Sequence, residues 1–225
     1  GGADPRPGEI SLSHNGVLFL DKLPEWDRKA LEVLREPLES GTVTVSRAAR
    51  SSEFPARFQL VAAMNPCPCG WAGDPSGRCR CSPEHIRRYR ARISGPLMDR
   101  IDLHIEVPRL PPQDLRPDAP NGEATFLIRA RVEQARTVQL QRTGKANAQL
   151  GQAETMAFCR LQDRDQALLE RAIERLQLSA RSMHRILRVA RTIADLAGAE
   201  DIATRHLTEA LGYRRMDRGQ GQQAA

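Results

Sequence analysis

Two polar side chains suited to chemistry follow short apolar runs. Asp21 comes directly after Val17-Leu18-Phe19-Leu20, and Asn65 follows the mostly apolar residues 58–64. Runs that are apolar at successive positions indicate parallel strands covered by helices on both faces. Because ligands bind outside the carboxyl ends of such strands, we expect Asp21 and Asn65 to face one slot.

The chemistry of that slot would be nucleotide binding. A carboxylate after four apolar residues is typical of a Walker B strand, where it helps hold Mg²⁺ against the phosphates. An amide on the neighbouring strand, such as that of Asn65, could position a water molecule near a γ-phosphate. The alternatives are an ordinary helix cap at Asp21 and a turn residue at Asn65, before Pro66.

Arg100 precedes a run in which Ile101, Leu103, Ile105 and Val107 alternate with polar residues, which predicts a third, half-exposed strand. An arginine in this place could reach the nucleotide of a neighbouring subunit and stabilise transition-state charge. The local sequence favours the simpler interpretation, an ion pair with Asp99 or Asp102.

Four of the five cysteines form two C-x-C pairs separated by nine residues: Cys67, Cys69, Cys79 and Cys81. Four thiolates can build a closed tetrahedral zinc site, and His85 is a spare ligand. Reduced thiols or an opportunistic disulfide are the alternatives. The odd number of cysteines argues against a disulfide scaffold.

An arginine-rich stretch surrounds and follows the second cysteine pair. Its only acid is Glu84, and its members are Arg78, Arg80, Arg87, Arg88, Arg90 and Arg92. Such a surface suits phosphates of nucleic acid. A solvated or inter-subunit helix face explains it equally well.

The elements that must position these residues divide the chain into two parts. Residues 1–108 read as α/β. Besides the strands, we expect a helical segment over residues 26–39, with Pro24 just before it at a place that the first turn of a helix would tolerate. We further expect a C-cap at Gly41 and a strand at residues 42–45. Residues 46–55 read as a hairpin tip that carries Arg47 and Arg50. A proline-rich linker at 109–122 then leads to an all-helical part, 123–225.

The clearest helix runs from an N-cap at Ser179 to about Ala197. At 100° per residue, one stripe of it is apolar: Met183, Ile186, Leu187, Ala190, Ile193, Ala194 and Ala197. Arg181, Arg185 and Arg188 lie on the other side, which reads by default as a solvated face.

Composition restricts the class of protein. The 225 residues are 40% hydrophobic and 4% aromatic, and the net charge of +6 suits a polyanionic partner such as nucleic acid or a nucleotide. No apolar run approaches the roughly 20 residues of a membrane span. The first residues lack a signal-peptide pattern, so we expect a cytoplasmic protein with no membrane partner.

Six segments together resemble the ComM/YifB family of magnesium-chelatase-like AAA+ ATPases. They cover nearly the whole chain, and their combination in this order is highly specific. The segments are 8–12, 16–24, 34–41, 62–70 (Ala-Ala-Met-Asn-Pro-Cys-Pro-Cys-Gly), 94–102 and 179–196.

The resemblance implies a role for each candidate residue. Asp21 corresponds to the Walker B carboxylate that holds Mg²⁺, Asn65 to sensor 1, Arg100 to the arginine finger acting in trans, and Arg181 to sensor 2 on a helical lid. Residues 42–58 would be the pre-sensor hairpin. The family further implies ATP as cofactor, hexameric rings of identical subunits, and DNA branch migration in recombination and natural transformation.

Lys22 departs from the family pattern, in which a glutamate follows the Walker B aspartate and polarises the attacking water. A protonated lysine cannot act as that base, and Glu25 is a poor substitute. We therefore expect strongly impaired hydrolysis, with Lys22 in the position of the catalytic glutamate.

The phosphate-binding motif G-x-x-x-x-G-K-[ST] does not occur in the sequence; at the one Gly-Lys pair, Gly144-Lys145, the next residue is Ala146. We expect the phosphate-binding loop to precede Gly1 in a longer protein, and nucleotide binding by these residues alone to be weak. Two other functions stay open at this point. One is an ATPase subunit that drives metal insertion into a porphyrin, and the other is a non-catalytic DNA-binding module.

Overall fold

The computed structural model describes residues 5–47, 50–118 and 122–214. The chain forms two compact units, residues 1–101 and residues 102–225. The first unit is α/β and the second is helical.

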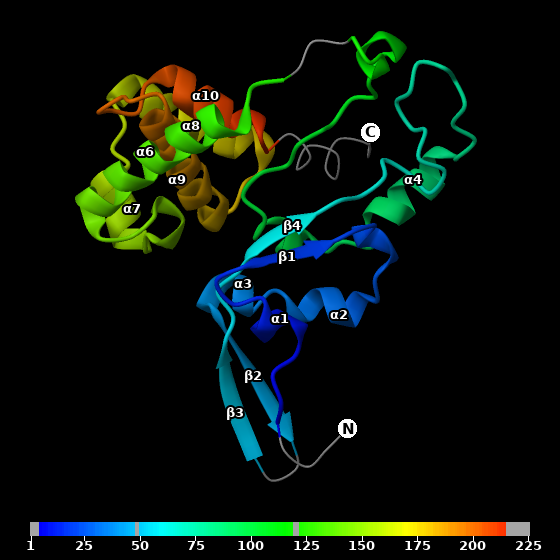
Figure 1. Ribbon diagram of the computed structural model, residues 1–225, viewed down its shortest axis with the longest axis horizontal. Helices are drawn as coiled ribbons and strands as arrows, with labels where there is room; N and C mark the ends of the chain where they lie inside the picture. Colours follow the sequence, from blue (N-terminus) through cyan, green and yellow to red (C-terminus); the bar gives the residue numbers. More distant parts are fainter. Residues whose placement is uncertain (1–4, 48–49, 119–121, 215–225) are drawn as a thin grey trace. The chain divides into compact units, whose positions relative to one another are not determined.

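The first unit is built on a two-stranded parallel sheet. Strand β1 (Val17–Leu20) pairs with β4 (Gln59–Ala62), in a register that places Leu20 opposite Ala62. Both predicted strands are confirmed, although β4 is shorter than the apolar run that predicted it. A parallel pair needs a crossover connection, and residues 21–58 supply it (Figure 1).

The sheet is covered on one face. Leu18, Leu20 and Leu60 point into a cluster that contains Leu31, Leu34, Leu97 and Ile10. On the other face Val17 and Phe19 are each 59% exposed and Val61 is 40% exposed. The prediction of strands buried on both faces is therefore wrong for the described residues. Side chains alternate across a strand, so a single layer of helices buries only every second residue.

That layer consists of short helices. They are α1 (Glu9–Leu12), the 3₁₀ turn η1 (Leu23–Glu25), α2 (Arg28–Val33), α3 (Pro37–Ser40) and α5 (Gly95–Met98). The single helix predicted over residues 26–39 is broken in two. Asp27 caps α2 by accepting from the backbone N–H groups of Lys29 and Ala30. Pro37, which has no N–H to donate, begins α3 instead of continuing α2.

Gly41 ends α3 in the left-handed region, with φ of +74°, as the sequence predicts. A hairpin of β2 (Thr42–Arg47) and β3 (Arg50–Pro55) follows and projects away from the parallel sheet (Figure 1). The ladder extends to the Arg47–Arg50 pair. Most of the predicted tip, residues 46–55, is thus strand. Residues 48–49 and the side chains of Arg47 and Arg50 lie outside the described part.

The last part of the first unit connects β4 to a basic helix. Residues 66–82 form a loop without helix or strand, and α4 (Pro83–Arg90) begins after it. The Ser82 hydroxyl caps α4 by accepting from the backbone N–H of His85 at 3.2 Å. Tyr89 is buried and anchors the helix.

The third strand predicted over residues 101–107 does not form, since these residues carry no strand among the described ranges. Their alternating pattern leaves Leu103, Ile105 and Val107 exposed. The backbone N–H of His104 donates to Tyr213 instead of to a strand. A strand needs a partner at hydrogen-bonding distance, and the local pattern alone cannot provide one. The 3₁₀ turn η2 (Pro112–Leu115) follows in the proline-rich segment.

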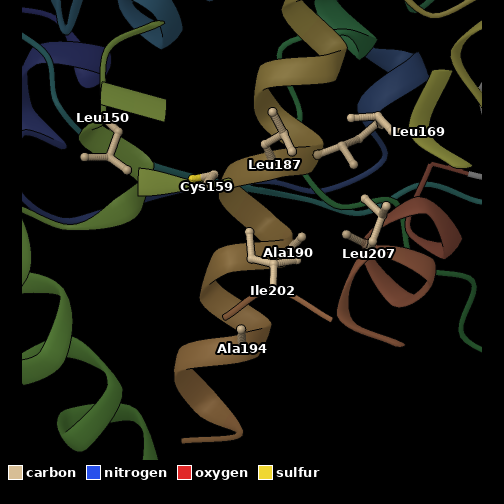
Figure 2. Close-up of a cluster of buried hydrophobic side chains, with 10 residues drawn as sticks. Leu150, Cys159, Leu169, Leu187, Ala190, Ala194, Ile202 and Leu207 are labelled. Carbon is tan, nitrogen blue, oxygen red and sulfur yellow. The ribbon is translucent and has the colours of Figure 1, made fainter. Parts of the chain in front are cut away.

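The helical unit packs around one central helix, α9 (Ala180–Leu196). Its other elements are α6 (Thr125–Thr143), η3 (Asn147–Gln149), α7 (Gln152–Phe158), α8 (Asp163–Leu176) and α10 (Thr204–Gly212). The predicted cap is confirmed, because the Ser179 hydroxyl accepts from the backbone N–H of Ser182. The apolar stripe of α9 lies in the core, with Ile186, Leu187, Ala190 and Ala194 buried among residues of α8 and α10 (Figure 2).

The sequence predicts a solvated face on the opposite side of α9, and this prediction is wrong for Arg185 and Arg188. Arg185 is 7% exposed and forms a 2.6 Å ion pair with Asp102. Arg188 donates to the carbonyl oxygens of Ala148 and Leu150. Neighbouring segments contact α9 on this side too, so Arg185 and Arg188 serve as structural donors. Arg181, in the first turn, is exposed.

A buried carboxylate joins three elements of the helical unit. The side chain of Asp195 is fully buried and accepts from Arg142, Arg191 and Asn147. Arg191 also donates to the carbonyl oxygens of Ala199 and Glu200. Because a buried charge is tolerated only with partners, this network fixes α6, η3 and α9 to one another. Within the described residues, no helix is both long and apolar enough to cross a membrane.

Candidate functional site

The two strand tips of the first unit meet at one edge of the sheet. Leu20 and Ala62 are partners in the parallel register. Asp21 directly follows Leu20, and Asn65 lies three residues beyond Ala62. The pairing continues past the strands, since the Ala63 N–H donates to the Leu20 carbonyl and the Leu23 N–H to that of Ala63, both at 2.9 Å. Asp21 and Asn65 are exposed at this edge.

The turn after Asp21 has an unusual backbone. Lys22 adopts the left-handed conformation, with φ of 51° and ψ of 47°, which few residues other than glycine adopt. The indole Nε1 of Trp26 donates to the Asp21 carbonyl oxygen at 2.8 Å and closes the turn. Among the described residues, no ion pair involves the Asp21 carboxylate. The carboxylate is therefore available to a cation.

A groove of about 620 Å³ adjoins this turn. It is lined by Glu25, Trp26, Asp27, Arg28, Arg88, Ala91 and Arg92. The lining brings the start of α2 and the end of α4 together, with charges of both signs. The polar lining suits a charged rather than an apolar occupant.

Arg100 is held inside the first unit. Its guanidinium forms a 2.6 Å ion pair with Glu39 and donates to the Pro96 carbonyl at 2.7 Å. The Arg100 side chain is 9% exposed, while that of Glu39 is 45% exposed. The sequence favoured Asp99 or Asp102 as the ion-pair partner of Arg100, whereas the structure shows an ion pair with the distant acid Glu39. Reaching another subunit requires that this ion pair open.

Three predicted nucleotide residues, Asp21, Asn65 and Arg100, lie in the first unit, and Arg181 lies in the helical unit. A carboxylate oxygen and an amide oxygen at one sheet edge are suitable ligands for Mg²⁺ and its water molecules. Asp21 and Asn65, both in the first unit, fit the magnesium side of such a site. The phosphate-binding side is not supplied by any motif in the 225 residues.

The four clustered cysteines come together in the loop. Their Sγ atoms all lie within 4.8 Å of one another, and His85 is outside the group. The Cys67 sulfur is 3.3 Å from that of Cys69 and 3.8 Å from that of Cys79. All four thiols are free, so the structure contains no disulfide among them.

The backbone around the first cysteine pair, Cys67 and Cys69, favours thiolate. The Ala72 N–H donates to the Cys67 sulfur at 3.3 Å. Hydrogen bonds from the backbone N–H groups of Arg80 and Trp71 lower the pKa of Cys69 to about 6. N–H donors stabilise the charged form of an acceptor, and the thiolate is the form that ligates metals.

The arginines beside the cluster remain at the surface, but several have partners. Arg87 and Arg88 share Glu84 at 3.0 and 3.1 Å. Arg78 stacks on Trp71, with 5.0 Å between its guanidinium carbon and the ring centroid. Arg90 donates to the Pro66 carbonyl. The arginines outnumber the single acid, so the exposed surface is basic.

Three contributors were not foreseen from the sequence. They are Trp26, which closes the Asp21 turn, Glu39, which holds Arg100, and Asp102, which pairs with Arg185. The contacts of Glu39 and Asp102 join residues that are 61 and 83 positions apart, which no local motif relates. Only Trp26 had a sequence signal, its place five residues after Asp21.

Two family descriptions match successive parts of the chain. Residues 1–115 match the family described as magnesium chelatase, subunit ChlI, and residues 122–214 match the C-terminal family of the same subunit. The chain belongs to the magnesium chelatase ChlI family, a group of AAA+-like ATPases.

Among curated proteins, the chain is 53% identical to competence protein ComM of Haemophilus influenzae over 97% of its own length and 42% of that protein. It is 49% identical to the uncharacterized protein YifB of Escherichia coli, over 97% of the chain and 43% of YifB. A shorter similarity, 29% identity over 43% of the chain and 11% of the relative, is to DNA replication licensing factor mcm-6 of Caenorhabditis briggsae. The chain thus spans about two fifths of the length of ComM and of YifB.

Proposed function

We propose that this chain is part of an ATP-driven motor that acts on DNA. The observation that carries the proposal is the exposure of Asp21 and Asn65 at the same end of two parallel strands. That arrangement is the one expected for a magnesium carboxylate and a sensor amide. Membership of an ATPase family supports the same assignment.

Each candidate residue has a role in the proposed site. Asp21 holds Mg²⁺ through its unpaired carboxylate, and Asn65 positions water or a phosphate oxygen. Arg100 acts on the nucleotide of a neighbouring subunit after it leaves Glu39. Arg181, exposed in the first turn of α9, contacts the nucleotide from the helical lid. A site shared in this way requires a ring of identical subunits, which we take to be a hexamer.

The DNA partner is supported by charge. Residues 78–92, which include α4, expose six arginines and contain one acid, Glu84. The arginines are Arg78, Arg80, Arg87, Arg88, Arg90 and Arg92. Such a surface neutralises phosphates irrespective of base sequence. One relative is a competence protein and another is a DNA replication licensing factor, and the name of the second refers to DNA. We infer that the work done is branch migration or unwinding of DNA during recombination and natural transformation.

Lys22 sets an expected limit on this motor. Lys22 directly follows Asp21 in the sequence, and a protonated lysine cannot take a proton from water. Nucleotide-dependent steps would therefore run slowly unless another base serves. This makes Lys22→Glu the useful background for an activity assay.

The test uses the complete gene product that carries these residues, with Lys22→Glu. ATP turnover is measured with and without a four-way DNA junction. The conversion of that junction into duplex products is measured in parallel. We expect DNA-stimulated turnover, loss of both activities in Asp21→Asn, and retention of both in the matched variant Asp201→Asn, at an exposed position of the helical unit. Turnover that ignores DNA, or a D21N protein with full activity, would overturn it.

The family match itself favours a second candidate, an ATPase subunit of a complex that inserts magnesium into a porphyrin. Both candidates use the same nucleotide residues, so only the partner separates them. Turnover stimulated by a porphyrin and Mg²⁺, with no response to DNA, would select the chelatase. Salt-sensitive DNA binding without any turnover in K22E would select a third candidate, a non-catalytic DNA-binding module.

A further inference from the structure

The cysteine cluster has the dimensions of a metal site. Sulfur–sulfur distances are 3.3 Å for Cys67–Cys69, 3.7 Å for Cys69–Cys79 and 3.8 Å for Cys67–Cys79. A tetrahedron with metal–sulfur bonds of about 2.3 Å places its sulfur atoms about 3.8 Å apart. Cys81 completes the group, with all four sulfur atoms within 4.8 Å of one another.

The packing around these thiols is unlike that of a core cysteine. Cys159 is 3% exposed and belongs to the hydrophobic cluster of the helical unit. In the loop only Cys67 is buried, whereas Cys69 is exposed and Cys79 and Cys81 are half-buried. Burial of apolar surface therefore does not account for bringing these four side chains together.

The loop backbone is shaped to converge on one point. Gly70 and Gly77 adopt positive φ angles of 79° and 66°, which glycine tolerates without a steric penalty. The Gly70 N–H donates to the Cys67 carbonyl at 3.0 Å, which makes a tight turn around the first pair. With the N–H donors that face Cys67 and Cys69, this turn resembles the backbone of a thiolate knuckle.

The cluster also connects two separate elements. Cys67 and Cys69 follow β4, and Cys81 directly precedes Ser82, the cap of α4. The 17 residues 66–82 contain neither helix nor strand. A bond network through one central atom would fix the start of the arginine-rich helix to the end of the sheet.

We propose that Cys67, Cys69, Cys79 and Cys81 bind one zinc ion as a closed four-thiolate structural site. Soft thiolate ligands in a tetrahedral arrangement select Zn²⁺ over hard cations such as Mg²⁺. With all four positions taken by the protein, the ion has no place for substrate and contributes stability instead of catalysis. The inference does not depend on the motor proposal.

The first experiment measures zinc by mass spectrometry in protein purified without chelators. We expect one zinc ion per chain in the wild type and in Cys159→Ala, which removes the thiol outside the cluster. C67S/C69S and C79S/C81S should each lose at least nine tenths of the metal. Wild-type protein without zinc, or double variants that retain it, would overturn the proposal.

The second measurement needs no variant and so does not depend on variants that fold. X-ray absorption at the zinc edge of the wild type should show a shell of sulfur alone, at about 2.3 Å. Titration with a mercurial reagent should release the zinc as the four cluster thiols react. A shell that contains nitrogen or oxygen, or zinc that stays bound after those thiols are modified, would contradict a four-thiolate site.

Discussion

Arg100 is held by Glu39, a residue 61 positions earlier in the chain, through a contact of 2.6 Å. Because the Arg100 side chain is 9% exposed and that of Glu39 is 45% exposed, the arginine depends on this one carboxylate for its charge partner. The proposed action of Arg100 on a neighbouring subunit must therefore compete with an interaction inside its own unit.

Glu39→Gln should weaken the first unit by about 1–2 kcal/mol, since it leaves a mostly buried guanidinium without an opposite charge. Both tryptophans, Trp26 and Trp71, lie in this unit, so their fluorescence during urea unfolding reports on it. The control is Glu84→Gln, whose ion pair with Arg87 is at least half exposed and worth at most about 1 kcal/mol. Equal losses in the two variants would show that Glu39 does not have this role.

Asp195→Asn should have a larger effect on the helical unit, a loss of about 3–5 kcal/mol, because Arg142 and Arg191 lose the buried carboxylate that both contact. The helical signal in circular dichroism follows the change, while the tryptophan transition of the first unit stays in place. Glu154→Gln is the control in the same unit. It breaks a half-exposed ion pair with Lys145, and we expect a loss below about 1 kcal/mol. A neutral D195N variant would contradict the proposed importance of the network.

The Cys159 thiol should not react with alkylating reagents in the folded chain. Burial raises the pKa of its thiol to about 11, so the reactive thiolate is scarce at pH 8. Mass spectrometry after brief alkylation should find Cys159 unmodified in native protein and fully modified in urea. The raised pKa also has a linkage consequence. Relative to C159A, the stability contributed by the neutral thiol is fully present below about pH 9 and is lost as the pH rises through 11. Rapid native alkylation would disprove the burial on which this rests.

Removal of charge from α4 tests the proposed DNA surface. Arg87→Ala combined with Arg88→Ala should weaken binding to a branched duplex and reduce the slope of log affinity against log salt by about one to two. The upper value would apply if their ion pairs with Glu84 open on binding. The matched control, Arg171→Ala with Arg175→Ala, removes the same charge from exposed positions on α8. If both pairs change the slope equally, α4 is not a specific contact surface.

The parts of the fold that could be predicted from the sequence are those in which a local pattern decides the structure. The apolar run before Asp21, the left-handed glycine at position 41 and the cap at Ser179 all correspond to the structure. The helix predicted over residues 26–39 fails at Pro37, where the loss of one N–H outweighs the spacing of the leucines.

Distant contacts account for most of the remaining differences. Residues 101–107 alternate as a strand should, yet no described strand pairs with them. The sequence pattern predicts a solvated Arg185, but in the structure this side chain pairs with Asp102, which lies 83 positions away. For the candidate site, the spacing of the four cysteines indicated a cluster, but only the fold shows that the sulfur atoms meet. Pairing over such separations leaves no signal in one sequence.

If residues 21 and 22 lie against the reacting phosphate, as we propose, both must affect ATP turnover by the complete gene product. We expect slow turnover in wild type, an increase of at least tenfold in Lys22→Glu, and a return to background in the double variant D21N/K22E. Equal rates in the wild type and K22E, or undiminished turnover in the double variant, would contradict it.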